Sequence, residues 1–89
     1  MLNVTSAAGD HLRDMLERAK VPGNAAVRIL VKPDGLKTTF DRERIGDTSI
    51  DHEGRRVLLL DPKAASVLSG LTLDVDTEGA EGSHLICLA

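Results

Sequence analysis

The 89-residue sequence has 11 basic and 14 acidic residues, a net charge of −3 and an apolar share of 42%. A chain of this length has room for one hydrophobic core, so we expect a single domain spanning residues 1–89. Phe40 is the only aromatic residue, and the charge balance is acidic, which argues against nucleic-acid binding. No stretch is apolar enough to cross a membrane and Cys87 is the only cysteine, so we expect a cytoplasmic protein without internal disulfides.

The chain is predicted to begin with a short strand and a helix. Residues 2–4 alternate apolar and polar side chains, and Thr5 or Ser6 can cap a helix that follows. The helix is indicated by apolar residues that fall on one stripe: Ala8, Leu12, Met15, Leu16 and Ala19. Pro22 and Gly23 are expected to stop it.

Two strands joined by a turn are predicted next. Residues 26–32 alternate as in a half-buried strand, residues 33–35 form the turn, and residues 36–41 return with Phe40 in the core. Residues 42–48 are polar and are predicted to be a loop. Five basic residues of this region are expected to form a solvated face: Arg28, Lys32, Lys37, Arg42 and Arg44.

A strand, a sharp corner and a short helix form the most distinctive part of the sequence. Residues 49–55 predict a short strand and a tight turn, and residues 57–60 are a continuous apolar run typical of a strand buried on both faces. Asp61 can cap the following helix, with Pro62 at its first position. Gly70 supplies the positive φ often found just past a helix.

The C-terminal region is predicted to be a hairpin. Residues 71–76 alternate as in a strand with one solvated face, residues 77–82 form a turn, and residues 83–88 form the last strand. The acidic residues here are read as a solvated sheet edge, or alternatively as a docking surface for a basic partner: Asp74, Asp76, Glu78 and Glu81. The whole predicts a compact, mainly β domain, a sandwich or barrel of about seven short strands with two small helices.

Four segments together resemble the HesB/IscA-like domain of A-type iron–sulfur cluster carriers. Residues 3–8 resemble the family's "xLTxxAA" start, and residues 26–31 its "GLRIxV" strand. Residues 57–63 are similar to "VxVLVDPKS", and residues 68–74 to "LxGLxIDY". The resemblance covers nearly the whole chain in the right order, and it implies the HesB-like fold and a role in or near iron–sulfur cluster biogenesis.

The sequence departs from this family at the cluster ligands. Cluster-binding members have a "GGCSG"-like loop after the second strand and a C-terminal Cys-x-Cys, whereas residues 32–36 form a shorter turn without cysteine. Residues 85–89 end the sequence before such a tail would begin. Clusters are held by several thiolates, which one cysteine per chain does not supply. We therefore expect a degenerate branch of the family that binds no cluster and no other cofactor.

The remaining candidate metal ligands are Cys87 and His84. Cys87 is predicted to be a small buried hydrophobe on the same strand face as Leu85, with His84 on the opposite face, so joint ligation is not expected. The alternative is a homodimer in which two Cys87 thiolates meet and hold a metal or cluster. Asp51, His52 and Glu53 are adjacent, and since neighbouring strand side chains alternate, no shared metal site is expected there.

No enzyme is predicted, because no serine lies in a Gly-x-Ser-x-Gly context and no phosphate-binding loop is present. The function classes that remain are a non-catalytic interaction module with a protein partner in iron–sulfur assembly, a metal binder using Cys87, and an unrelated small enzyme or ligand-binding domain. The first of these is the prediction.

Overall fold

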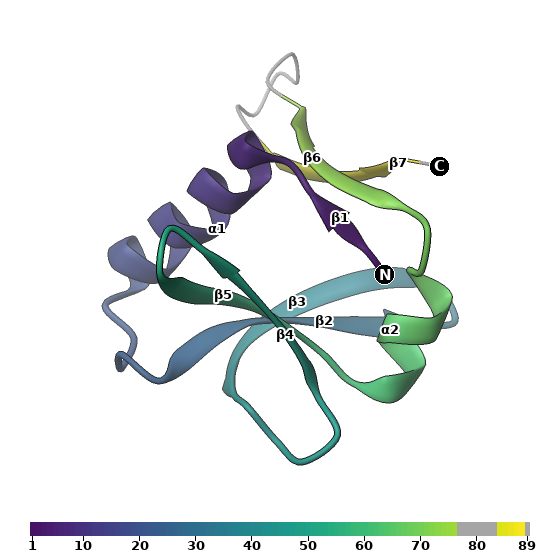
Figure 1. Cartoon of the computed structure of the whole chain (residues 1–89), viewed down its shortest axis with the longest axis horizontal. Helices are drawn as coiled ribbons and strands as arrows, with labels where there is room; N and C mark the ends of the chain where they lie inside the picture. Colours follow the sequence, from purple (N-terminus) through teal and green to yellow (C-terminus); the bar gives the residue numbers. More distant parts are fainter. Residues whose placement is uncertain (77–83, 89) are drawn as a thin grey trace.

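The structure is a computed structural model that describes residues 1–76 and 84–88 (Figure 1). The described residues form seven strands and two helices: β1 (Asn3–Val4), α1 (Ser6–Ala19), β2 (Ala25–Lys32), β3 (Gly35–Arg42), β4 (Thr48–His52), β5 (Arg55–Leu60), α2 (Pro62–Val67), β6 (Thr72–Asp76) and β7 (His84–Leu88). A four-stranded sheet has the order β3-β2-β5-β4, and a three-stranded sheet has the order β1-β6-β7. The mainly β architecture is confirmed. The predicted turn at residues 77–82 lies outside the described residues.

Helix α1 begins and ends where its sequence signals lie. The Thr5 hydroxyl accepts a hydrogen bond from the Ala8 N–H at 3.1 Å, so Thr5 is the N-cap. The helix ends at Ala19, and Lys20 follows in the left-handed conformation with φ 54°. Most of its predicted apolar stripe faces the core, with Leu12 and Leu16 fully buried, but Ala19 at the end of the helix is exposed.

Strand β5 is one of the two interior strands of the larger sheet. It pairs in parallel with β2 and antiparallel with β4, and Val57–Leu60 are buried on both faces. The Asp61 carboxylate then accepts a hydrogen bond from the Ala64 N–H at 2.7 Å, which caps α2, and Gly70 has φ 83°. The predicted strand, corner and short helix are confirmed.

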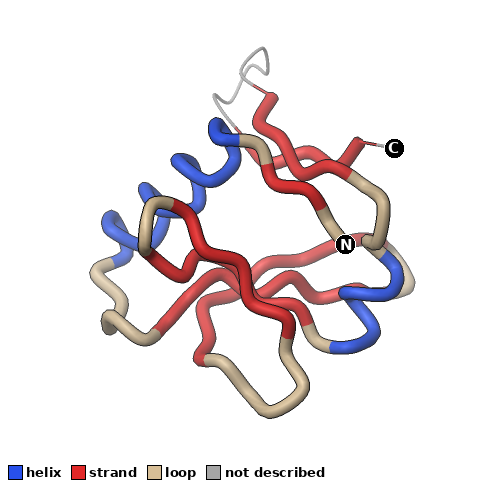
Figure 2. Tube along the Cα trace, viewed as in Figure 1, coloured by secondary structure: helices blue, strands red, loops and turns tan. Residues whose placement is uncertain are grey.

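The core fills the space between the sheets and the helices. Figure 2 shows the strands running between the two helices, with α1 on one side of the molecule and α2 on the other. The buried core consists of aliphatic side chains: Leu2, Ala8, Leu12, Leu16, Val27, Ile29, Val57, Leu58, Leu60, Ala64, Leu68 and Leu73. Neither helix within the described part of the chain has the length and apolar character needed to span a bilayer.

Two predictions for the hairpin of β2 and β3 are wrong. Phe40 does not fill the core, because β3 is an edge strand and the Phe40 side chain is 42% exposed. Strand β2 is not half-solvated throughout either, since Ala25–Ile29 are all buried. Arg28, predicted to lie on a solvated face, is therefore inside the protein.

Candidate functional site

Cys87 lies in β7, the edge strand of the three-stranded sheet, opposite Leu73 of β6. Both Leu85 and Cys87 pack against the core, as the alternation of the strand predicts. Beside the thiol is a small hollow of about 120 Å³ between the two sheets. Its lining is largely apolar: Ile29, Leu36, Thr38, Leu73, Leu85, Ile86 and Cys87.

These surroundings make the Cys87 thiol a weak ligand. Burial raises the pKa of Cys87 above its usual value, because a thiolate is poorly solvated among aliphatic side chains. Metal ions and clusters bind the thiolate rather than the thiol. The environment therefore favours a small neutral side chain at this position over a metal ligand.

The turn between β2 and β3 is short, as the sequence predicts, and it contains no cysteine. Lys32 pairs directly with Gly35, so Pro33 and Asp34 alone connect the two strands. Leu36, which follows this turn, lines the same hollow as Cys87. The short turn thus lies at the Cys87 end of the hairpin and brings no second thiol to it.

The two candidate ligands near the C-terminus both lie in β7. The backbone of His84 pairs with Asp76, and Cys87 is three residues further along the same strand. The side chain of His84 lies outside the described residues.

The predicted acidic edge is only partly described by the structure. Asp74 accepts a hydrogen bond from the Thr5 hydroxyl at 2.8 Å and so ties the start of α1 to β6. Glu78 and Glu81 lie outside the described residues.

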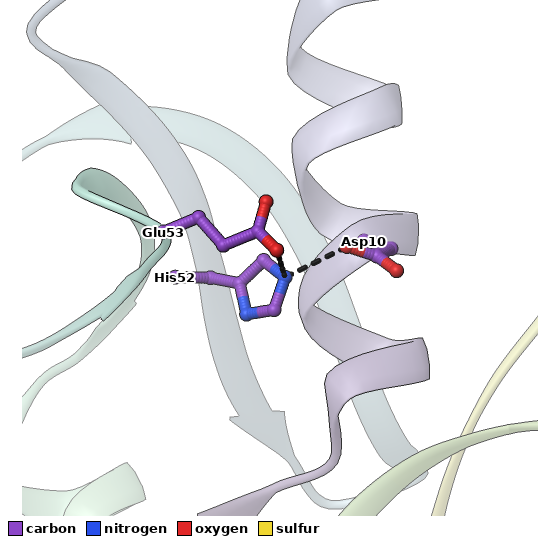
Figure 3. A group of neighbouring side chains, drawn as sticks. All are labelled: Asp10, His52 and Glu53. Atoms are coloured by element: carbon purple, nitrogen blue, oxygen red, sulfur yellow. Dashed lines mark hydrogen bonds and ion pairs between the residues drawn. The ribbon is translucent and has the colours of Figure 1, made fainter.

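The interpretation of residues 51–53 is wrong for Glu53. Glu53 has φ 51° and belongs to the turn between β4 and β5, so the alternation of a strand does not apply to it. Its carboxylate comes within 4.0 Å of His52 Nε2, and Asp10 of α1 approaches the same nitrogen at 2.7 Å (Figure 3). Asp51 points elsewhere and binds Arg56. No local pattern in the sequence points to Asp10, because the helix and the turn meet only in the folded chain.

Arg28 is the centre of a buried ion cluster, although the sequence predicted that it lies on a solvated face with four other basic residues. Its guanidinium donates to Asp41 at 2.8 Å and to both oxygens of Asp47, at 3.0 and 2.6 Å. Its side chain is 5% exposed and that of Asp47 is 3% exposed. The prediction of a solvated face is confirmed for the other four of the five basic residues, which are exposed: Lys32, Lys37, Arg42 and Arg44.

The cluster perturbs all three groups. Hydrogen bonding to Asp47 raises the pKa of Arg28 above its usual value. The pKa of Asp47 is lowered chiefly by its hydrogen bonds from Arg28, and that of Asp41 chiefly by the bond from the Arg42 N–H and then by Arg28. Because every charge in the cluster is paired, it has the character of a structural anchor for the loop between β3 and β4.

Comparison with solved structures identifies the fold. Escherichia coli SufA, described as involved in biosynthesis of iron–sulfur clusters, is 28% identical, with a TM-score of 0.76 over 97% of this chain and 82% of its own. IscA with a 2Fe–2S cluster is 17% identical, with a TM-score of 0.67 over 98% of this chain and 83% of its own. The chain therefore has a HesB/IscA-like fold, which confirms the resemblance seen in its sequence. No family model and no curated protein matches the sequence.

Proposed function

We propose that this protein acts in iron–sulfur cluster assembly in the cytoplasm, as a non-catalytic interaction module that does not itself bind a cluster. One observation carries the proposal: the fold of iron–sulfur biogenesis proteins extends over 97% of a chain that contains a single cysteine. Such a chain offers a folded surface to protein partners, but its 89 residues supply only one of the several thiolates that hold a cluster.

The chemistry of the Cys87 environment supports this function. A cluster needs several thiolates, and Cys87 is one half-buried thiol whose pKa is raised. The turn at Pro33 and Asp34 adds none. A pair of Cys87 thiolates across a homodimer is the alternative, and it would require moving the thiol out of its aliphatic surroundings.

The partner in this proposal is an assembly or client protein that docks on the exposed edge of the larger sheet. Among the described strands, none pairs with the outer side of β3, which there offers backbone N–H and C=O groups to a further strand. Leu36 and Phe40 are large apolar side chains exposed on this strand. An edge with unpaired backbone groups and apolar side chains suits strand addition by a partner.

Anaerobic purification with iron and sulfide quantitation tests the absence of a cluster. We expect iron and sulfide well below one equivalent per chain, both as isolated and after reconstitution with iron and sulfide. A stoichiometric cluster absorbance that disappears in Cys87→Ser would overturn the proposal and support the homodimer alternative.

Partner binding is tested separately, by affinity capture with purified cluster-assembly and cluster-bearing proteins. Phe40→Asp is expected to abolish capture, because it places a charge on the exposed strand without disturbing the core. Lys63→Asp, which changes an exposed charge on α2, is the control and should leave capture intact. Failure of the parent protein to retain any of these proteins would count against the interaction role.

A further inference from the structure

Three side chains with metal-binding atoms converge at the contact between α1 and the β4–β5 turn. Asp10 projects from the helix, while His52 at the end of β4 and Glu53 in the turn that follows project toward it (Figure 3). One ligand atom from each lies within 4.8 Å of the others. His52 Nε2 is 2.7 Å from Asp10 Oδ1 and 4.0 Å from Glu53 Oε1. We call these three residues the helix–turn cluster.

Gly9 allows the His52 ring to lie against the helix backbone. A Cβ at Gly9 would lie 2.4 Å from His52 Nδ1 and 2.5 Å from His52 Cγ. These distances are too short for atoms that are not bonded, so any residue other than glycine would displace the ring. Glycine inside a helix costs about 0.5–1 kcal/mol relative to alanine, and here it makes room for the imidazole. The ring is thereby held with only 16% of its side chain exposed and with Nε2 directed at Asp10.

Glu53 is oriented by its backbone and by a neighbouring arginine. Its φ of 51° and the φ of 81° at Gly54 form the tight turn that sends the Glu53 side chain toward α1. Arg13 donates to Glu53 Oε2 at 3.0 Å and is itself 3.4 Å from Glu17, so the other oxygen, Oε1, is the one nearest His52. In metal sites, a ligating carboxylate is typically held in place by a hydrogen bond from a residue that does not itself bind the metal, as Arg13 does here.

The charge and ligand type suit a cation. The carboxylates of Asp10, Glu53 and Glu17 outnumber the single guanidinium of Arg13 at this place. An imidazole with two carboxylates selects first-row transition metals, whereas Mg²⁺ and Ca²⁺ prefer oxygen ligands alone. Bonds of about 2.0–2.2 Å to one ion require ligand atoms about 3–4 Å apart. The observed separations are close to this range, and the exposed carboxylates can rotate to meet it.

We propose that Asp10, His52 and Glu53 bind one divalent first-row transition-metal ion of the Zn²⁺ or Fe²⁺ class. His52 Nε2 and one oxygen of each carboxylate are the protein ligands, and water completes the coordination. The ion replaces the hydrogen bond between His52 and Asp10 and ties α1 to the larger sheet. The site contains no thiolate and does not depend on the proposed role in cluster assembly.

Calorimetric titration of the metal-free protein with Zn²⁺ measures the affinity. We expect one equivalent to bind the parent protein, Asp10→Asn to bind about tenfold or more weakly, and His52→Ala to lose the site. Asp14→Asn is the matched control, since it removes an exposed carboxylate one turn along the same helix, and should bind as the parent does. Cys87→Ser should also bind normally.

Paramagnetic broadening by Mn²⁺ locates the ion without relying on a variant that fails to fold. In the NMR spectrum of the parent protein, the broadened amide signals are expected at residues 9–13 and 51–55. Gly9→Ala should weaken the broadening by displacing the His52 ring. Absence of Zn²⁺ binding to the parent, equal affinities for the parent and Asp10→Asn, or broadening centred elsewhere would each overturn the proposal.

Discussion

Replacing Asp47 with asparagine tests how strongly the buried Arg28 cluster anchors the loop between β3 and β4. The Asp47 carboxylate accepts three hydrogen bonds, two from Arg28 and one from the Arg44 N–H at 2.7 Å. Asparagine has nearly the same shape, but its amide nitrogen faces a donor whichever way it is turned. Hydrogen bonds to charged groups contribute about 1.5–3 kcal/mol, and breaking a buried ion pair costs about 3–5 kcal/mol. Because Asp41 still compensates Arg28, we expect the free energy of unfolding to fall by about 2–4 kcal/mol.

Urea denaturation followed by circular dichroism measures this loss. The matched control is Asp51→Asn, which makes the same change in an exposed carboxylate that pairs with Arg56 on the sheet surface. The urea concentration at the unfolding midpoint of Asp51→Asn should stay close to that of the parent, because solvent screens exposed ion pairs. The slope of the transition should be the same for both variants. If Asp47→Asn and Asp51→Asn shift the midpoint equally little, burial does not strengthen the Arg28 cluster and the reasoning fails.

Three further predictions concern pH, packing and thiol reactivity. Because the folded-state pKa of Asp41 and Asp47 is lowered, their stabilisation is complete above the unfolded carboxyl pKa of about 3.9 and is lost as the pH falls below it. The urea midpoint should therefore drop in acid, and less steeply in Asp47→Asn; equal drops would contradict this. Leu58→Ala, in the centre of β5, should destabilise by about 2–5 kcal/mol in urea melts, while Val67→Ala on the exposed face of α2 should change little. Iodoacetamide should alkylate Cys87 more slowly in the native protein than in urea, since burial raises the pKa of Cys87; equal rates would show that the thiol is not shielded.

The parts of the fold that the sequence predicted correctly depend on local signals. Thr5 caps α1 through a bond to a residue three positions on, and Asp61 caps α2 in the same way. The apolar run at 57–60 marks an interior strand, because a strand covered on both faces has apolar residues at consecutive positions. These features require no knowledge of distant segments.

The errors arose where a distant segment decides the environment. Arg28 looked solvated because basic side chains usually are, yet Asp41 and Asp47 neutralise it from the neighbouring strand and loop. Phe40 looked buried because aromatic residues usually are, yet its strand lies at a sheet edge. Composition cannot tell an edge strand from a central one.

The helix–turn cluster shows the same limit for a candidate site. His52 and Glu53 are adjacent in sequence, but Asp10 reaches them only because α1 packs across the sheet. Glu53 is already in the turn, where the alternation of strand side chains no longer applies. The tight turn predicted within residues 49–55 has Glu53 and Gly54 as its central residues, both with positive φ.

The pairing of β1 with β6 has a consequence for the order in which the chain folds. The four-stranded sheet is built from the contiguous residues 25–60, so its strands can pair as soon as that segment is made. The three-stranded sheet joins residues near the two ends of the described chain, and closing so long a loop is slow. We expect β1, β6 and β7 to assemble last. Until then the Cys87 thiol is open to solvent, and oxidants or thiol reagents have access to it before folding is complete.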